Sequence, residues 1–184
     1  MMTDLRDFTG LSDRLPGDDV IELLDDYFEA IATPIEKRKG EVLKFIGDGV
    51  LAIFPAEDDD DFSSSSAHAL DAAMEGLDRL DMVNRARRAA GGDELRIGIG
   101  LHLGEVIFGN VGAAGRLDFT VIGPAVNEVA RIEALCEPLG RSMLVSAAFA
   151  AALGDPARLT SLGHHDLRGV REPREIYGVV AGAG

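Results

Sequence analysis

The amino-acid sequence predicts an α/β (α+β) sandwich with a ferredoxin-like βαββαβ core and additional C-terminal strands. Three observations predict it. Apolar residues recur at helical spacing in long segments, and short β-rich runs occur in pairs between them. The order along the chain is strand, helix, two strands, helix, two strands, helix, then strands. The 184 residues show no repeat and no linker, so we expect a single domain over residues 1–184.

Helices are predicted where apolar residues follow a period of about 3.6, over residues 17–39, 67–90 and 124–136. We expect Gly40 and Gly91 to end the first two, because glycine tolerates the left-handed conformation common at helix C-termini. Pro124 suits the first turn of the third helix. Ser146 is expected to cap a short helix that ends at Leu153.

Strands are predicted from short runs rich in β-branched residues. Val42–Ile46 and Val50–Phe54 flank Gly47-Asp48-Gly49, a glycine-rich centre that indicates a tight hairpin. Leu95–Leu103 and Glu105–Val111 are expected to form a second hairpin. Its turn is expected at Gly104, and further strands at 118–122, at 142–145 and, broken at Gly163, Gly169 and Pro173, over 159–180.

Glycines inside predicted strands weaken them, so they indicate close backbone approaches or bulges at Gly98, Gly100 and Gly109. Residues 56–66 are rich in aspartate and serine and are expected to form a solvated acidic loop. A metal site there is disfavoured, because neighbouring like charges repel one another.

The charge balance restricts the partners. The chain has 18 Lys and Arg against 32 Asp and Glu, a formal net charge of −14, so we expect neither nucleic-acid binding nor attraction to anionic membranes. ATP can still bind where a few cations converge or metal ions bridge the repulsion. No apolar run approaches the ~18 residues of a membrane span, so membrane insertion is not expected. The lone Cys136 is expected to be a buried hydrophobe, which fits a reducing cytoplasm.

Two aspartates suggest a metal centre. Asp4 follows a short apolar start, and Asp48 lies at the tip of the glycine-flanked hairpin. If the first strand lies beside this hairpin, both carboxylates reach one edge of the sheet, where they repel unless cations lie between them. Divalent ions ~3.5–4 Å apart would satisfy both and assist phosphoryl chemistry. The alternative is that each is an ordinary turn or strand-end residue.

Lys44 has two interpretations. It is expected to share a strand face with Val42 and Ile46, where a charge has to reach water or find a partner. It then acts either as a donor to a purine ring or as an edge-strand charge that prevents aggregation.

Asn127 and Arg131 lie four residues apart and project from one side of a predicted helix. Near a helix N-terminus such a pair makes a good clamp for a phosphate or a transition state. The alternative is a surface asparagine and an arginine paired with Glu128 or Glu133.

Five stretches together resemble the class III adenylyl/guanylyl cyclase catalytic domain, and bacterial members most. They are TDLRDFTGLSDRL, KFIGDGVLAIF, LRIGIGLHLGEVIFGNVG, RLDFTVIGPAVNEVARIEALC and LGHHDLRG. Each is weak alone, but five in this order are specific, and the resemblance extends from Thr3 to Val180. It implies a core of the nucleotide cyclase type.

The resemblance implies a role for each candidate residue. Asp4 and Asp48, with the main-chain carbonyl of Leu5, would bind two divalent cations, Mg²⁺ or Mn²⁺. Lys44 and Thr120 would select the purine. Because adenine N1 accepts and N6 donates a hydrogen bond, a lysine and a threonine suit adenine. Guanine reverses this pattern, and guanylyl cyclases of the family use a glutamate and a cysteine, so ATP is the expected substrate.

The same resemblance implies that Asn127 positions the ribose and that Arg131 stabilises charge on the α-phosphate. Arg168 stands where the family usually has a lysine that holds the terminal phosphates. Arginine keeps that charge but replaces a point contact by a planar fork. Arg116 is a weaker candidate for a phosphate contact.

The implied enzyme is a cytoplasmic adenylate cyclase that converts ATP to 3′,5′-cyclic AMP and pyrophosphate. It would act as a homodimer with shared active sites. Asp4 and Asp48 would come from one chain and the purine- and phosphate-binding residues from the other.

Several alternatives stay open. Only three residues precede Asp4, where the family has several apolar strand residues, so we expect a truncated first strand. This fits a longer protein with an N-terminal regulatory region, a misplaced start, or reduced activity. The rival functions are a catalytically silent nucleotide-binding dimerisation module and a cyclase with relaxed ATP/GTP selectivity.

Overall fold

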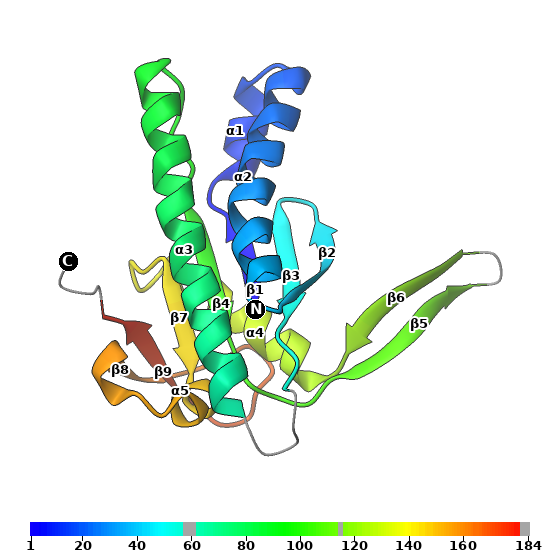
Figure 1. Cartoon of the computed structure of the whole chain (residues 1–184), viewed down its shortest axis with the longest axis vertical. Helices are drawn as coiled ribbons and strands as arrows, with labels where there is room; N and C mark the ends of the chain where they lie inside the picture. Colours follow the sequence, from blue (N-terminus) through cyan, green and yellow to red (C-terminus); the bar gives the residue numbers. More distant parts are fainter. Residues whose placement is uncertain (57–61, 114–115, 181–184) are drawn as a thin grey trace.

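The computed structural model describes residues 1–56, 62–113 and 116–180, with the side chains of 111–119 excepted. Within these residues a seven-stranded sheet has the order β2-β3-β1-β4-β7-β9-β8 (Figure 1). These strands are, in sheet order, Glu41–Ile46, Gly49–Ile53, Met2–Leu5, Ile97–Leu101, Met143–Ser146, Arg174–Val179 and Leu159–His165. The order β2-β3-β1-β4, with helices between β1 and β2 and between β3 and β4, confirms the predicted ferredoxin-like core.

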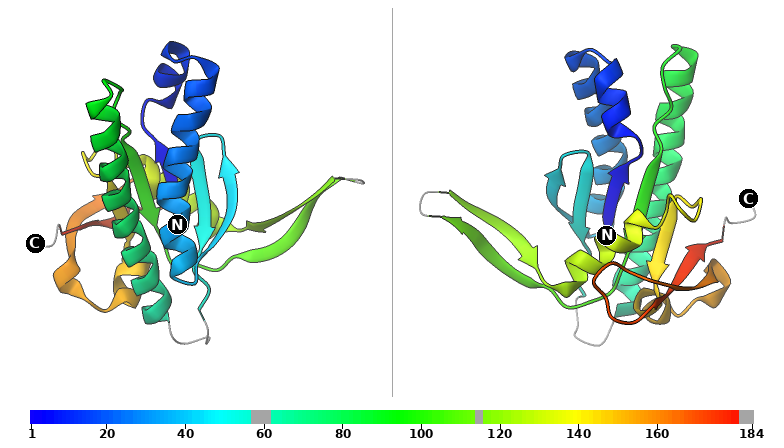
Figure 2. Two further views of the ribbon diagram at one scale, coloured as in Figure 1. Left: turned by 45° about the horizontal axis from the view of Figure 1, so that its top comes forward. Right: turned by 180° about the vertical axis from the view of Figure 1, so that it is seen from behind.

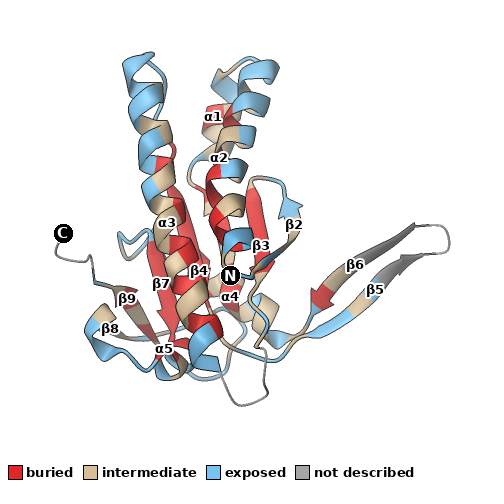
Figure 3. Ribbon diagram, viewed as in Figure 1, coloured by how far each residue is buried: buried red, intermediate tan, exposed pale blue. Residues whose placement is uncertain are grey.

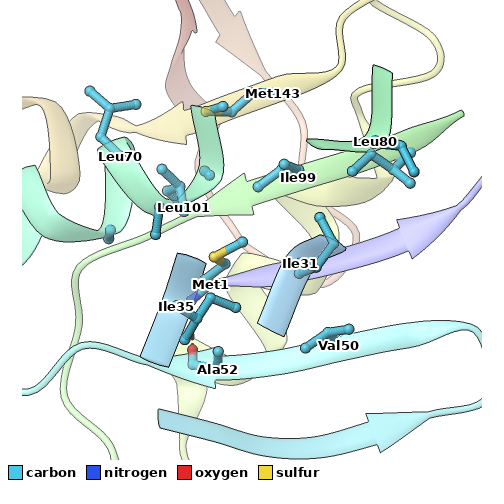
Figure 4. Packing of buried hydrophobic residues seen from close by; sticks show 14 of the residues in the cluster. Met1, Ile31, Ile35, Val50, Ala52, Leu70, Leu80, Ile99, Leu101 and Met143 are labelled. Atoms are coloured by element: carbon cyan, nitrogen blue, oxygen red, sulfur yellow. Dashed lines mark hydrogen bonds between the residues drawn. The ribbon is translucent and has the colours of Figure 1, made fainter. Parts of the chain in front are cut away.

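Two long helices, α2 (Gly17–Lys37) and α3 (Phe62–Ala89), lie side by side on one face of the sheet (Figures 1 and 2). Their apolar stripes pack on the central strands, where Ile31 and Leu70 meet Val50 and Ile99 (Figure 4). Burial is concentrated along β3, β4 and β7 (Figure 3). This face therefore supplies most of the hydrophobic stabilisation.

Helix α4 (Pro124–Ala134) crosses the opposite face, as the reverse view shows (Figure 2). A Cβ added to Gly100 would lie 2.7 Å from the main-chain oxygen of Val129, and one at Gly98 would collide with Arg6 and Glu133. Both glycines therefore mark close approaches, as predicted. For Gly109 the prediction is wrong, because no described atom lies within 4 Å of an added Cβ and its pairing with Thr120 is regular.

The predicted hairpin at Gly104 is wrong. β4 pairs with β1 and β7 instead, and β5 (Ile107–Ala113) pairs with β6 (Arg116–Ile122) in a separate two-stranded sheet. This β5–β6 arm projects away from the body of the molecule (Figure 1). Both sets of pairings satisfy backbone hydrogen bonds, so local β-propensity alone did not decide between them.

The helix boundaries largely follow the predicted signals. Gly91 adopts a φ of 79° at the end of α3, Pro124 begins α4, and Ser146 accepts a hydrogen bond from the Phe149 amide at the start of α5 (Ala147–Leu153). At the end of α2 the left-handed residue is Lys39, with a φ of 62°, and not the expected Gly40. The amide of Gly40 instead donates to the Ile35 carbonyl, which completes a Schellman-type ending.

Other differences are local. A short helix that the sequence reading missed, α1 (Phe8–Arg14), follows β1. Gly163 does not break a strand; it lies at a register shift within β8, and a 3₁₀ turn (Pro156–Arg158) precedes that strand. The acidic loop predicted for 56–66 overlaps residues 57–61, which lie outside the described residues, and α3 already begins at Phe62. No helix in the described ranges is both long and apolar enough to cross a membrane.

The glycine contacts generate a stability prediction. Gly100→Ala should lower the free energy of unfolding by about 1–3 kcal/mol, because α4 has to shift away from the new methyl group. Gly109→Ala is the matched control, since its methyl group meets open space and should change stability by less than about 0.5 kcal/mol. Urea unfolding of both variants measures the difference, and equal losses would contradict the close approach.

Candidate functional site

Backbone pairing brings Asp4 and Asp48 to the same edge of the sheet, at the end of strand β1 and the turn between β2 and β3. β1 and β3 are antiparallel neighbours with Asp4 opposite Gly49, and the Leu5 amide donates a 3.4 Å hydrogen bond to the Asp48 carbonyl. Thr3 faces α2, where its hydroxyl lies 2.6 Å from the Tyr27 hydroxyl. Since side chains alternate along a strand, Asp4 faces the α4 side.

The electrostatics of this edge favour a cation. Burial raises the pKa of Asp4, the negative charge of Asp48 raises it further, and Arg6 opposes both. Two half-buried carboxylates and the nearby Leu5 carbonyl are oxygen donors of the kind that Mg²⁺ takes when phosphates complete its coordination. Among the described residues, no group of three or more His, Cys, Asp or Glu could hold an ion by itself. Two carboxylates and one carbonyl leave coordination positions that phosphate oxygens could fill.

A buried ion pair lies beside the two aspartates. Arg6 Nη2 lies 2.8 Å from Glu133 Oε1, with the two side chains 14% and 7% exposed. Burial raises the pKa of Glu133 to about 7, the Arg6 charge lowers it, and Asp4 and Asp48 raise it. The 2.8 Å contact with the Arg6 guanidinium indicates that Glu133 is ionised at neutral pH.

Lys44 and Val42 were predicted to share a strand face, but they lie on opposite faces of the sheet. The β2–β3 register shifts between Val42 and Lys44, so the side-chain alternation is interrupted there. Val42 packs on the main core, and the ring of Phe45 lies 4.4 Å from that of Phe28 in α2. Lys44, opposite Leu51, therefore faces away from α2, on the same side of the sheet as Asp4.

Thr120 lies in β6 opposite Gly109, where it is partly buried. β6 contacts β2, so the strands that carry Lys44 and Thr120 are neighbours even though they belong to different sheets. The predicted purine-selecting pair thus comes from adjacent elements. Arg116 also lies in β6, but its side chain is outside the described part of the structure.

Asn127 and Arg131 line a cleft of about 570 Å³ between α4 and the loop that joins β8 to β9. The guanidinium of Arg131 lies against Gly169, whose added Cβ would be 3.4 Å from Arg131 Nη2. The alternative in which Arg131 pairs with a neighbouring glutamate is not observed: Glu133 pairs with Arg6, and Glu128 lies 3.4 Å from Arg174.

Arg168 is exposed on the same loop, next to Gly169. The sequence reading missed Arg174, which lines the cleft, and the Arg6–Glu133 pair. Arg174 is 43 residues from Arg131 in the chain, and no spacing rule links them. For Glu133 a signal existed, since a carboxylate two residues after Arg131 on a helix points to another side of that helix.

The candidate residues therefore form two groups within one chain. Asp4 and Asp48 meet at the hairpin edge, whereas Asn127, Arg131 and the Gly169 loop surround the cleft. Neither Asp4 nor Asp48 is among the described residues that line the cleft.

A family model described as the adenylate and guanylate cyclase catalytic domain matches residues 1–181. Among curated relatives, adenylate cyclase 1 of Rhizobium meliloti is 33% identical over 180 residues, which covers 98% of this chain and 27% of that protein. The adenylate cyclase of Anabaena cylindrica is 31% identical over 157 residues, which covers 85% of this chain and 30% of that protein. The chain thus spans under a third of these relatives' length.

Solved structures give the same fold. The adenylyl cyclase CyaB from P. aeruginosa superposes with a TM-score of 0.88 at 27% identity, covering 98% of this chain and 92% of that one. The guanylyl cyclase Cya2 superposes with a TM-score of 0.84 at 31% identity, covering 100% and 90%. Neighbours of both substrate types therefore share this architecture.

The raised pKa of Asp4, caused first by burial and then by the charge of Asp48, generates a prediction about pH. Because the pKa of Asp4 is raised in the folded chain, the folded state binds the Asp4 proton more tightly than the unfolded state. Stability is therefore lost as pH rises from the unfolded pKa through the folded one. With metal removed by a chelator, Asp4→Asn should be more stable than the original chain at pH 7 and should lose this advantage near pH 3. Denaturant unfolding at both pH values measures this difference. A variant less stable than the original chain at pH 7 would contradict the raised pKa of Asp4.

Proposed function

Since this chain belongs to the adenylate and guanylate cyclase catalytic domain family, we propose that it is an adenylate cyclase that converts ATP to 3′,5′-cyclic AMP and pyrophosphate. One observation carries the proposal: two carboxylates that repel one another are held at the same sheet edge by backbone pairing. A fold gains no stability from that arrangement, whereas a metal–triphosphate complex requires it.

Asp4, Asp48 and the Leu5 carbonyl would hold two divalent cations, Mg²⁺ or Mn²⁺. When bound, such ions neutralise phosphate charge and lower the pKa of an attacking hydroxyl. No side chain need act as a dedicated base, and we infer that a carboxylate oxygen of Asp4 or Asp48 passes the ribose 3′-hydroxyl proton to water. The 3′-oxygen then attacks the α-phosphorus and pyrophosphate leaves.

Several cationic side chains are available for the phosphates even though the chain has a formal net charge of −14. Arg131 would donate to the α-phosphate oxygens as charge develops there, and the Asn127 amide would hold the ribose. Arg168 would bind the terminal phosphates, with Arg116 as a further candidate. Arg174, which the cleft brings close to Arg131, adds a positive charge that Glu128 partly neutralises.

For the base, Lys44 would donate to adenine N1 and Thr120 would accept from N6. The proximity of β2 and β6 supports their joint action. The similarity to the guanylyl cyclase Cya2 keeps relaxed ATP/GTP selectivity as a second candidate.

We propose that the enzyme is a cytoplasmic homodimer in which each active centre combines the Asp4–Asp48 half of one chain with the remaining residues of the other. The separation of the two groups within one chain supports this arrangement. So does the exposed apolar surface at the base of the β5–β6 arm, where Ile107 and Ile122 are 67% and 47% exposed. A second copy that covered this surface would place its own residues next to the arm.

Turnover is the direct test. With Mn²⁺ or Mg²⁺ the purified chain should convert ATP to cyclic AMP faster than GTP to cyclic GMP, measured by chromatography of the products. Arg131→Ala should lower kcat by about 100-fold to 1,000-fold, because it removes a donor to the developing charge. Joint Lys44→Glu and Thr120→Cys replacement should shift the preference toward GTP. No cyclic product from a folded dimer would favour the silent nucleotide-binding module.

Shared centres predict complementation. Asp48→Ala and Arg131→Ala chains, each inactive alone, should regain activity when mixed, because one of the two centres in a mixed dimer keeps all its residues. With equal subunit exchange, about a quarter of the original activity is the expected ceiling. A folded mixture without activity would contradict the shared centre.

A further inference from the structure

The Arg6–Glu133 contact joins two elements that the proposed reaction uses separately. Arg6 follows β1 and is two residues from Asp4, whereas Glu133 lies in α4 and is two residues from Arg131. Besides the 2.8 Å ion pair, Arg6 Nη2 donates a 3.2 Å hydrogen bond to the main-chain carbonyl of Glu133. One guanidinium therefore grips both the side chain and the backbone of α4.

The sheet makes room for this contact. Gly98 lies opposite Asp4 in β4, and any side chain there would overlap the Arg6 guanidinium and the Glu133 carboxyl group. The backbone of Arg6 is itself fixed, because its amide donates a 2.7 Å hydrogen bond to the Arg96 carbonyl. The Arg6 end of the pair is thus held by a backbone hydrogen bond and not only by side-chain packing.

The contact is also poorly replaceable. Glu133 Oε1 is buried and has no hydrogen-bond partner among the described residues, so the charge of Arg6 is what compensates it. Removing either partner leaves an uncompensated group in a buried position, which proteins tolerate badly. A pair of this kind is weak evidence for stability, but it fixes the geometry of the elements that it joins.

We propose that Arg6 and Glu133 are positioning residues. Within each chain they fix Asp4, which serves one active centre, relative to Arg131, which serves the other. The inference rests on the proposed function, because only in a dimer with shared centres do Asp4 and Arg131 of one chain serve different centres. A shift of α4 at one centre would then be transmitted through Glu133 and Arg6 to the metal aspartate of the second.

A dimer with a single working centre tests this. Chains with Asp48→Ala and chains with Arg131→Ala carry different tags and are purified together, so that the working centre takes its aspartates from the Arg131→Ala chain. Glu133→Gln is then introduced into one chain at a time. Its placement decides which half of the working centre it can affect.

In the chain that supplies the aspartates, Glu133→Gln should raise the Mn²⁺ concentration for half-maximal activity about 10-fold and leave kcat unchanged. In the chain that supplies Arg131, it should lower kcat about 10-fold and leave the Mn²⁺ requirement unchanged. A purely structural role would move the same parameter in both placements, and that result, or no change in either, would overturn the proposal.

Two further measurements keep the interpretation sharp. Asp71→Asn, which removes the 2.6 Å ion pair between α3 and Arg158 far from this edge, is the control for loss of a salt bridge and should change neither parameter. Arg6→Lys keeps the positive charge and should leave both parameters close to the values found with arginine.

If the reference mixed dimer is inactive, the proposed function fails. Calorimetric Mn²⁺ titration of the otherwise unmodified chain then still decides the positioning role. Glu133→Gln should weaken binding about 10-fold, whereas an unchanged affinity would overturn that role.

Discussion

The repulsion between Asp4 and Asp48 is the constraint on which the rest of the arrangement depends. The backbone sets their proximity, because β1 pairs antiparallel with β3 and the Leu5 amide donates a hydrogen bond to the Asp48 carbonyl. β1 also pairs with β4, so the sheet holds β1 in place beside β3. The fold therefore maintains an unfavourable charge pair at a position where a bound metal would make it favourable.

The opposite side of α4 carries the complementary chemistry. Arg131 faces the cleft with Gly169 while Glu133, less than one helical turn further on, faces the sheet and Arg6. One short helix therefore presents the residue proposed to bind phosphate toward the cleft and a residue that contacts Arg6 toward the sheet. The helical period of about 3.6 makes this division available from residues only two positions apart.

Much of this arrangement was predictable from the sequence. Periodicity located α2, α3 and α4, and the Gly47-Asp48-Gly49 turn located the hairpin that places Asp48 near β1. Tertiary pairing was not predictable in the same way. The run after Gly104 has strand propensity whichever partner it takes, and only the whole sheet shows that β4 already has a neighbour on each side. The bulge beside Lys44 was likewise not predicted; it accompanies the packing of Phe45 against Phe28 of α2.

The residues that the sequence did not reveal are those whose partners are far apart in the chain. Arg6 and Glu133 are separated by 127 positions, and each alone looks like a solvated surface charge. They can meet under α4 because Gly98 has no side chain to occupy the space that they fill. Sequence patterns identify candidate ligands more readily than the residues that hold those ligands in place.

The two glycines of β4 also constrain how this chain can change over generations. A side chain at Gly98 would displace the Arg6 and Glu133 side chains, and one at Gly100 would require α4 to move outward, so either change disturbs the Arg6–Glu133 contact. Single substitutions at these positions thus lead through less fit intermediates. Strand and helix therefore have to vary in concert at these positions.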